Sequence, residues 1–363
     1  MSVDPRPELQ YLKPAEHGGP DLAELNELGL SPDLILDFST CINPFGPPPG
    51  WRKVLRSLPV EFYPDSDSTQ LRRRLASKLG LSGERVLVGA GSVELLRLTT
   101  LSFLSPGDLV LIPQPTFGEY EMASRLAGAR VLKVRGREED DFRFDVEQLA
   151  HLLRRHRPRM IFLCNPNNPT GQCLKRQEVE VLLEASPESL LVLDEAYISF
   201  VRDPWPSLDL LNRGHVLILR SLTKDFSLAG VRLGYALASE KGISVLRRVQ
   251  PPWSVNVVAQ KLGLLALERD DWLEGCRRKL WREQVFLKRG ISRLGFQVLP
   301  SKAHFFLVRV GRATRFRKLL LQRGILVRDC TSFGLPDHIR LSPRSRSHNR
   351  RLLLALSELR EAL

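Results

Sequence analysis

The segment HVLILRSLTKDFSLAGVRLGYALAS, residues 215–239, has two apolar runs on either side of a polar stretch that contains one lysine, Lys224. Both runs are apolar nearly throughout, which is typical of strands that are buried on both faces of a sheet. A lysine at the end of such a strand is either a surface residue or a desolvated amine whose lowered pKa makes it a nucleophile. The residues that follow the other predicted strands are needed to choose between these interpretations.

Five similar runs come earlier in the chain, namely RVLVGA, DLVLIP, ARVLKV, RMIFLCNP and LLVLDEAY. Most of them are separated by segments with helical periodicity, and this alternation is typical of a mainly parallel sheet covered by helices. The sequence therefore predicts one large α/β domain with a sheet of seven strands.

The pattern changes after Pro251 and Pro252. Long amphipathic helices are predicted over residues 257–295, followed by the short strand candidates FQVLP, HFFLVRV, GILVRD and HIRLS and by a terminal helix. We therefore predict a large domain over residues 51–250 and a small α+β domain over residues 251–363. Residues 1–50 have few periodic signals and are interpreted as an extended arm that contributes to the small domain and the active site.

Composition excludes several classes of protein. No apolar run is long enough to span a bilayer, and the first 19 residues lack the apolar centre of a signal peptide, so we expect a soluble cytoplasmic protein without membrane contact. The five cysteines are scattered and predict neither a disulfide framework nor a metal site. The net charge of +13 is spread over leucine-containing helical segments, which favours solvated helix faces over a nucleic-acid surface.

Ligands of open α/β sheets bind at the carboxyl ends of the strands, so the residues after each run are informative. RVLVGAGSVE indicates a strand, a glycine turn and a helix whose first N–H groups can bind an anion. Glu94 stands where a dinucleotide fingerprint would have its third glycine, which argues against a dinucleotide. A phosphate-binding loop is the better interpretation.

The next strand ends place further polar and aromatic groups at the same edge. They are PQPTFGEY with Phe117, FLCNPNNPTGQ with two asparagines held between prolines, and LLVLDEAY with Asp194 and Glu195. An acid beside a buried strand is costly unless a cation or a hydrogen-bond donor pairs with it. These residues therefore predict a polar ligand site at the edge of the sheet.

Together, the ordered motifs GAGSVE, PTFGEY, NPNNPTG, VLDEAY, SLTKDFSLAGVRLG and HIRLS closely resemble those of the fold-type I enzymes of the aspartate aminotransferase superfamily. The resemblance extends from about residue 15 to the C-terminus. It implies an α/β fold with a large and a small domain, pyridoxal 5'-phosphate as the cofactor, and no metal.

The resemblance also implies roles for individual residues at the cofactor. Lys224 forms the Schiff base with the cofactor aldehyde, and Asp194 pairs with the protonated ring nitrogen, with Tyr197 as a further catalytic group. The remaining cofactor contacts fall into two sets: the phosphate is held by Ser221, Arg232 and the backbone of Ser92 and Val93, and the ring by Asn168, Tyr197 and Phe117.

Other implied roles concern the substrate and a partner subunit. Tyr63, in FYPDSDS, reaches the cofactor phosphate of the partner, which implies a homodimer with shared active sites. Arg340, in HIRLS, binds the α-carboxylate of the substrate. Arg328, in GILVRD, binds a phosphate group of the substrate. His17 and Asn43 are expected near these anions, and Asn168 is expected to contact the substrate as well as the cofactor.

Two related subfamilies fit the motifs. The threonine-phosphate decarboxylases of cobalamin biosynthesis share HGG at residues 17–19, LDFSTCINPFGPP, PPWSVNVVAQ and VRDCTSFGLPDHIRLSPR, and they give the leading interpretation, decarboxylation of L-threonine O-3-phosphate to (R)-1-aminopropan-2-ol O-2-phosphate. The histidinol-phosphate aminotransferases share YPD, PNNPTG, DEAY and Arg328, and they give the alternative. A regulatory module that binds the cofactor without turnover is a third, non-enzyme hypothesis.

Overall fold

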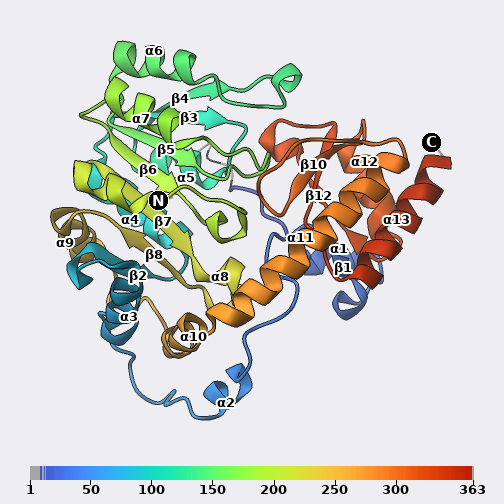
Figure 1. Ribbon diagram of the computed structural model, residues 1–363, viewed down its shortest axis with the longest axis horizontal. Helices are drawn as coiled ribbons and strands as arrows, with labels where there is room; N and C mark the ends of the chain where they lie inside the picture. The colour runs from blue at the N-terminus through green and yellow to red at the C-terminus, as the bar shows by residue number, and fades with distance from the viewer. Residues whose placement is uncertain (1–8, 10–11, 13, 362–363) are drawn as a thin grey trace, which may run out of the picture.

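The computed structural model describes residues 9, 12 and 14–361, and it contains three sheets (Figure 1). The largest has seven strands in the order β2-β8-β7-β6-β5-β3-β4. β8 is antiparallel to both of its neighbours, and the remaining pairs are parallel. The strands are β2 (Val86–Gly89), β3 (Leu109–Gln114), β4 (Arg130–Arg135), β5 (Met160–Cys164), β6 (Leu190–Asp194), β7 (Val216–Ser221) and β8 (Gly234–Leu237).

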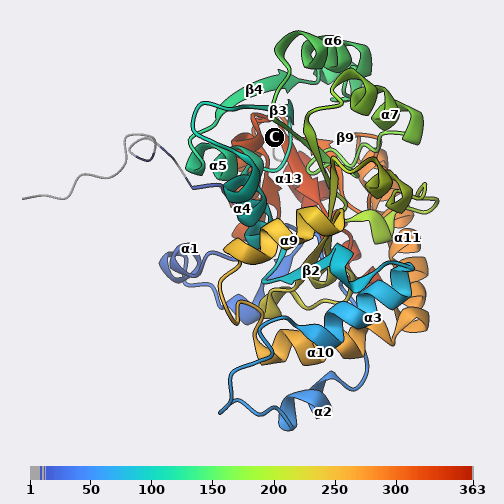
Figure 2. The same ribbon diagram turned by 90° about the vertical axis from the view of Figure 1, so that its left-hand side faces the viewer.

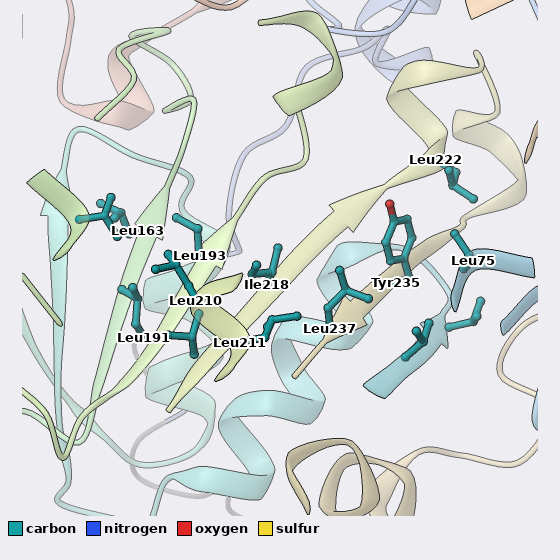
Figure 3. Packing of buried hydrophobic residues seen from close by; sticks show 14 of the residues in the cluster. Leu75, Leu163, Leu191, Leu193, Leu210, Leu211, Ile218, Leu222, Tyr235 and Leu237 are labelled. Atoms are coloured by element: carbon teal, nitrogen blue, oxygen red, sulfur yellow. The ribbon is translucent and has the colours of Figure 1, made fainter. Parts of the chain in front are cut away.

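Both faces of this sheet are buried, and neighbouring residues of one strand point to opposite faces. On β6, Leu191 and Leu193 pack into one hydrophobic cluster, while Val192 packs into another. Figure 3 shows the first cluster, in which Leu191, Leu193 and Ile218 lie together from adjacent strands. Burial of both faces explains why the strands are apolar throughout. Among the strands of this sheet, only β4, at the sheet edge, has exposed residues, which are Arg130, Lys133 and Arg135.

Helices cover the two faces. The first cluster includes residues of α3 (Thr69–Leu79), α6 (Val146–His156), α7 (Arg176–Ala185) and α10 (Val257–Leu267). The second includes residues of α4 (Ser92–Phe103), α5 (Glu119–Leu126) and α9 (Glu240–Val249), which lie on the opposite side (Figure 2). The short α8 (Leu222–Asp225) follows β7 at the carboxyl edge of the sheet.

A smaller sheet lies beside the large one and has the order β12-β13-β10-β9, with all of its pairs antiparallel. The long α11 runs from the large sheet to this part of the molecule and packs there with α12 and α13 (Figure 1). The elements are α11 (Asp270–Arg293), β9 (Gln297–Val298), β10 (Phe306–Arg309), α12 (Ala313–Leu321), β12 (Arg328–Asp329), β13 (His338–Leu341) and α13 (Arg346–Glu361).

The N-terminal segment is more ordered than the extended arm that we expected. It contains α1 (Leu22–Glu27), and β1 (Leu36–Asp37) pairs in parallel with β11 (Ile325–Leu326), while α2 (Trp51–Arg56) follows the proline-rich stretch. The predicted strand GILVRD is divided at Val327, because β11 pairs with β1 whereas β12 pairs with β13. This short segment therefore joins the N-terminal part to the small sheet.

The predicted fold class and the seven strands of the large sheet are confirmed. The domain boundaries at residues 50 and 250 stay predictions, and the start of the N-terminal segment, residues 1–8, lies outside the described residues. Among the described helices, none is both long and apolar enough to cross a membrane. The described residues also include no group of three or more His, Cys, Asp or Glu side chains that could hold a metal ion.

Candidate active site

A pocket of about 320 Å³ lies at the carboxyl ends of the large-sheet strands, next to the small sheet. This is where a ligand site is expected in a sheet of this topology. Most of the predicted site residues line it together, although they are far apart in the sequence. These residues are His17, Ser92, Val93, Phe117, Asn168, Asp194, Tyr197, Lys224, Arg232, Arg328 and Arg340.

Lys224 lies on α8, three residues after the end of β7, and its side chain lines the pocket. Burial lowers the pKa of its amine, and the nearby positive charges of Arg232 and Arg340 act in the same direction, against the opposing effects of Cys41 and Asp194. A lowered pKa increases the fraction of neutral, nucleophilic amine at neutral pH. Of the two interpretations of this lysine, the structure favours the desolvated nucleophile.

Asp194 ends β6 and is buried at the base of the pocket. Its carboxylate accepts hydrogen bonds from the Tyr120 hydroxyl at 2.8 Å and from the Ala196 backbone N–H at 2.9 Å. Burial nevertheless raises the pKa of Asp194, against the lowering effects of these hydrogen bonds and of the Lys224 charge, so a further cation in the pocket would favour its ionised form. The neighbouring Glu195 is already paired with Arg220 at 2.8 Å.

The start of α4 and the end of the Lys224 loop form an anion cradle. Gly91, with a φ of +86°, precedes the helix, and a Cβ atom at this position would lie 2.8 Å from the Arg232 guanidinium. Glycine therefore lets the arginine approach the N–H groups of Ser92 and Val93. Arg232 itself adopts a left-handed φ of 58°, a conformation that is seldom kept without a functional reason.

The two asparagines of NPNNPTG have different roles. Asn167 ties loops together, because its side chain bonds Thr116, Thr170 and the Pro115 carbonyl. Asn168 instead lines the pocket and accepts a hydrogen bond from Arg340. The geometry therefore selects Asn168 as the ligand-facing amide.

Aromatic groups lie on two sides of this region. Phe117 lines the pocket with one edge towards Tyr120, at a centroid distance of 5.6 Å. Tyr197 is buried, and its ring centroid lies 4.9 Å from that of Phe305. Burial raises the pKa of the Tyr197 hydroxyl, so this group stays a neutral hydrogen-bond donor. Both residues are placed to contact a planar ring.

Two arginines form the wall of the pocket on the small-sheet side. Arg328 on β12 and Arg340 on β13 are direct cross-strand partners, and both are buried. Burial and the charge of Arg340 lower the pKa of Arg328. Like charges that face each other across a strand pair are destabilising, so this arrangement favours an anion that binds both guanidiniums.

Three predicted residues do not line this pocket. Ser221 is buried with its hydroxyl 2.7 Å from that of Thr223. Asn43 is buried and holds the lysine loop, since its N–H bonds the Lys224 carbonyl and its side-chain amide bonds the Asp225 carbonyl, each at 2.9 Å. Tyr63 is 78% exposed and stacks on Trp253 at 4.3 Å.

Other pocket residues were missed by the sequence analysis. Tyr120 lies within the quoted motif PTFGEY, so its position after a strand end was a usable signal. Glu16 and Phe333 also line the pocket, and the Ser39 carbonyl accepts a hydrogen bond from Arg340 at 2.7 Å. A backbone carbonyl leaves no signal in the sequence.

The fold and the pocket together define an enzyme that uses pyridoxal 5'-phosphate. The residues fit this cofactor, because a buried carboxyl group that would pair with a cation, a desolvated lysine and a helix start beside Arg232 that can bind an anion share one pocket. The family described as aminotransferase class I and II matches residues 35–356, and the chain belongs to this family. Pyridoxal 5'-phosphate is accordingly its cofactor.

Similar proteins narrow the class further. A histidinol-phosphate aminotransferase of Symbiobacterium thermophilum is 36% identical over 356 residues, covering 97% of both chains. The crystal structure of histidinol-phosphate aminotransferase from Sinorhizobium meliloti in complex with pyridoxal-5'-phosphate superposes with a TM-score of 0.87 at 25% identity, covering 98% of this chain and 97% of that one. The crystal structure of L-threonine-O-3-phosphate decarboxylase from Porphyromonas gingivalis superposes with a TM-score of 0.79 at 28% identity, covering 89% of this chain and 98% of that one.

These likenesses favour the aminotransferase alternative over the decarboxylase that the terminal motifs suggested. The chain is thus an aminotransferase-class enzyme, and transfer of an amino group fits it better than carbon–carbon cleavage.

Proposed function

We propose that this enzyme transfers the amino group of a phosphorylated amino alcohol, histidinol phosphate, to 2-oxoglutarate. The observation that carries the proposal is the pair of buried arginines, Arg328 and Arg340, that face each other across β12 and β13 beside Lys224. Two adjacent guanidiniums fit a phosphate dianion or a carboxylate. The amine donor and the keto acid would each offer such a group in turn.

The remaining groups would carry the chemistry at the cofactor. When bound, the cofactor would supply an electron sink for negative charge at the substrate α-carbon. Lys224 would hold the cofactor and move the proton at that carbon. Asp194 would hold the positive ring nitrogen, with Tyr120 fixing the carboxylate. Ser92, Val93 and Arg232 would bind the cofactor phosphate, and Phe117, Asn168 and Tyr197 would orient the ring.

Threonine-phosphate decarboxylation is the second candidate, and the structure of the Porphyromonas gingivalis decarboxylase and the position of His17 and Gly18 at the pocket support it. In that reaction Arg340 would bind the carboxylate that must leave. Equal binding of this group before and during the reaction adds nothing to the rate. Histidinol phosphate has no α-carboxylate, so this difficulty does not arise for the aminotransferase.

One experiment separates the two candidates. The purified enzyme, loaded with its cofactor, is mixed either with histidinol phosphate and 2-oxoglutarate or with threonine phosphate and no keto acid. We expect glutamate from the first mixture and no carbon dioxide from the second, with Lys224→Ala as the inactive control. Carbon dioxide without glutamate formation would replace our proposal with the decarboxylase.

We also propose that the enzyme is a homodimer in which Tyr63 reaches the cofactor phosphate of the partner. Val60, Phe62 and Tyr63 are each at least 69% exposed, and Trp253 beside Tyr63 is 45% exposed. Exposed apolar residues grouped in this way mark interaction surfaces. Light scattering should give twice the chain mass of 41.2 kDa, and a monomer at working concentration would contradict the proposal.

A further inference from the structure

Residues 16–19, which we call the strap, cross the arginine wall of the pocket and are held there by three contacts. The Glu16 carbonyl accepts a hydrogen bond from Arg328 at 2.9 Å, and His17 Nε2 lies 3.0 Å from a Glu119 oxygen. Gly19 N–H donates to the Ser39 hydroxyl at 2.8 Å. The strap is therefore fixed by its backbone as well as by its side chains.

The middle of the strap has no room to shift towards the wall. A Cβ atom at Gly18 would lie 2.7 Å from the Ser39 carbonyl oxygen, which is the same oxygen that binds Arg340. The strap thus contacts the surroundings of both arginines. Glu16, at its start, is the strap residue closest to Arg328.

The described hydrogen bonds of Arg328 are donated by only one of its two terminal nitrogens. Nη2 donates both described hydrogen bonds, to the Glu16 carbonyl and to the Ser332 hydroxyl at 2.7 Å. Nη1 lies 3.7 Å from the Glu16 carboxylate, too far for a hydrogen bond. The arginine side chain is 8% exposed, whereas that of Glu16 is 68% exposed. A solvated carboxylate is therefore loosely held beside a buried cation in the pocket.

We propose that the Glu16 carboxylate occupies the position at Arg328 that the anionic group of the substrate takes, and that the substrate displaces it. The Glu16 carbonyl keeps its hydrogen bond to Nη2 during this exchange, so the strap stays in place. The inference rests on the proposed function in one respect only, namely that the anionic group of the substrate is a phosphate.

The exchange lowers the affinity of every anion that binds at Nη1. A phosphate dianion brings two negative charges and three acceptor oxygens to Nη1, and a monocarboxylate brings the same single charge as Glu16. The displaced carboxylate is already largely in water, so its return to solvent costs little. Glu16 is therefore a built-in competitor that lowers the affinity of phosphates and monocarboxylates by a similar factor, and a phosphate displaces it at a lower concentration than a monocarboxylate does.

The test compares the cofactor-loaded wild-type enzyme with Glu16→Gln, which keeps the backbone carbonyl and removes the charge. Inorganic phosphate and acetate serve as probes in titration calorimetry, and Glu27→Gln, an exposed glutamate of α1, is the matched control. For Glu16→Gln we expect phosphate to bind about two- to fivefold more tightly, the range that exposed charge pairs give, and acetate to gain by a similar factor. The gain in anion affinity should vanish in about 1 M salt, where the screening length is about 3 Å.

A double variant shows whether the effect acts through the arginine. In an Arg328→Gln background, Glu16→Gln should leave phosphate affinity unchanged. Unchanged or weaker phosphate binding by Glu16→Gln, or an equal gain in Glu27→Gln, would overturn the proposal. The inference is separable from the proposed function, because tighter phosphate binding without turnover of histidinol phosphate would reject only the latter.

Discussion

The two walls of the pocket are built in different ways. On the large-sheet side, Asp194 and Lys224 lie at or within three residues of a strand end, and each is held by its own sheet and loops. On the other side, Arg328 and Arg340 come from two short strands, and their guanidiniums are held by Glu16, Ser39 and other groups distant in the sequence. Most supports of the first wall come from the large sheet and its loops, with Asn43 as an N-terminal exception, whereas the second wall depends on both ends of the chain.

With the roles proposed above, this difference separates cofactor chemistry, on the large-sheet wall, from substrate choice, on the arginine wall. The large-sheet wall offers groups that the sheet and its loops hold in place, with Asp194 and Lys224 buried and open to a ligand, as expected for a cofactor that stays bound. The substrate wall offers two buried cations with incomplete partners, as expected for anions that come and go. Changes to one wall should therefore leave the function of the other largely intact.

The largest effect is expected from Arg340→Ala. It removes a buried cation and leaves the Ser39 carbonyl and the Asn168 amide oxygen without their donor. We expect kcat/KM for the phosphorylated amine to fall about a hundredfold, mainly through KM, while the enzyme still binds its cofactor. Steady-state kinetics measure kcat and KM, and the absorbance of the cofactor shows whether the enzyme still binds it. Arg309→Ala, an exposed arginine on β10, is the control, and loss of the cofactor from Arg340→Ala would break the proposed separation of the walls.

A smaller effect on the opposite wall is expected from Tyr120→Phe. The change removes one of the two hydrogen bonds to the buried Asp194 carboxylate, which raises the pKa of Asp194 further and weakens its hold on a cation. We expect kcat to fall about tenfold with every amino donor and KM to change little. Tyr235→Phe, another buried tyrosine outside the pocket, serves as the control. A loss confined to phosphorylated donors would instead assign Tyr120 to substrate binding.

The smallest effect concerns stability and Asp225, the neighbour of Lys224. This carboxyl is buried, accepts a hydrogen bond from Ser199 at 2.8 Å and has one oxygen without a partner among the described residues. Burial raises its pKa to about 7. Between about pH 4 and 7 the folded state therefore keeps a proton that the unfolded state releases, so this contribution to stability is lost as the pH rises.

Asp225→Asn removes that titration. Between pH 6 and 7, the free energy of unfolding of the variant should fall less than that of the wild type, by about 1 kcal/mol. Denaturant unfolding at the two pH values measures the difference, with the exposed Asp203→Asn as the control. A wild type and an Asp225→Asn variant with parallel pH profiles would show that the carboxyl is ionised in the folded state.

The sequence predicted the large sheet well because its strands are apolar on both faces, a pattern that each run displays by itself. It did not predict the pairing of β1 with β11 or the division of GILVRD at Val327, because pairing between distant two-residue strands has no local signal. Most residues that line the pocket on the large-sheet side were named beforehand from motifs, whereas Ser221 and Tyr63 do not line it, and the roles of all of them stay predictions. The role of Asn43 as a support of the lysine loop and the use of the Ser39 carbonyl depend on tertiary contacts alone.

The pairing of Leu36–Asp37 with Ile325–Leu326 also sets an order of assembly. During synthesis the N-terminal strand emerges early but has no partner until nearly the whole chain has been made. Contacts between such distant segments carry a high closure cost and form late in folding. The large sheet with Lys224 can form first, so we expect a nascent chain to complete its arginine wall last and to acquire its proposed selectivity only when synthesis is almost finished.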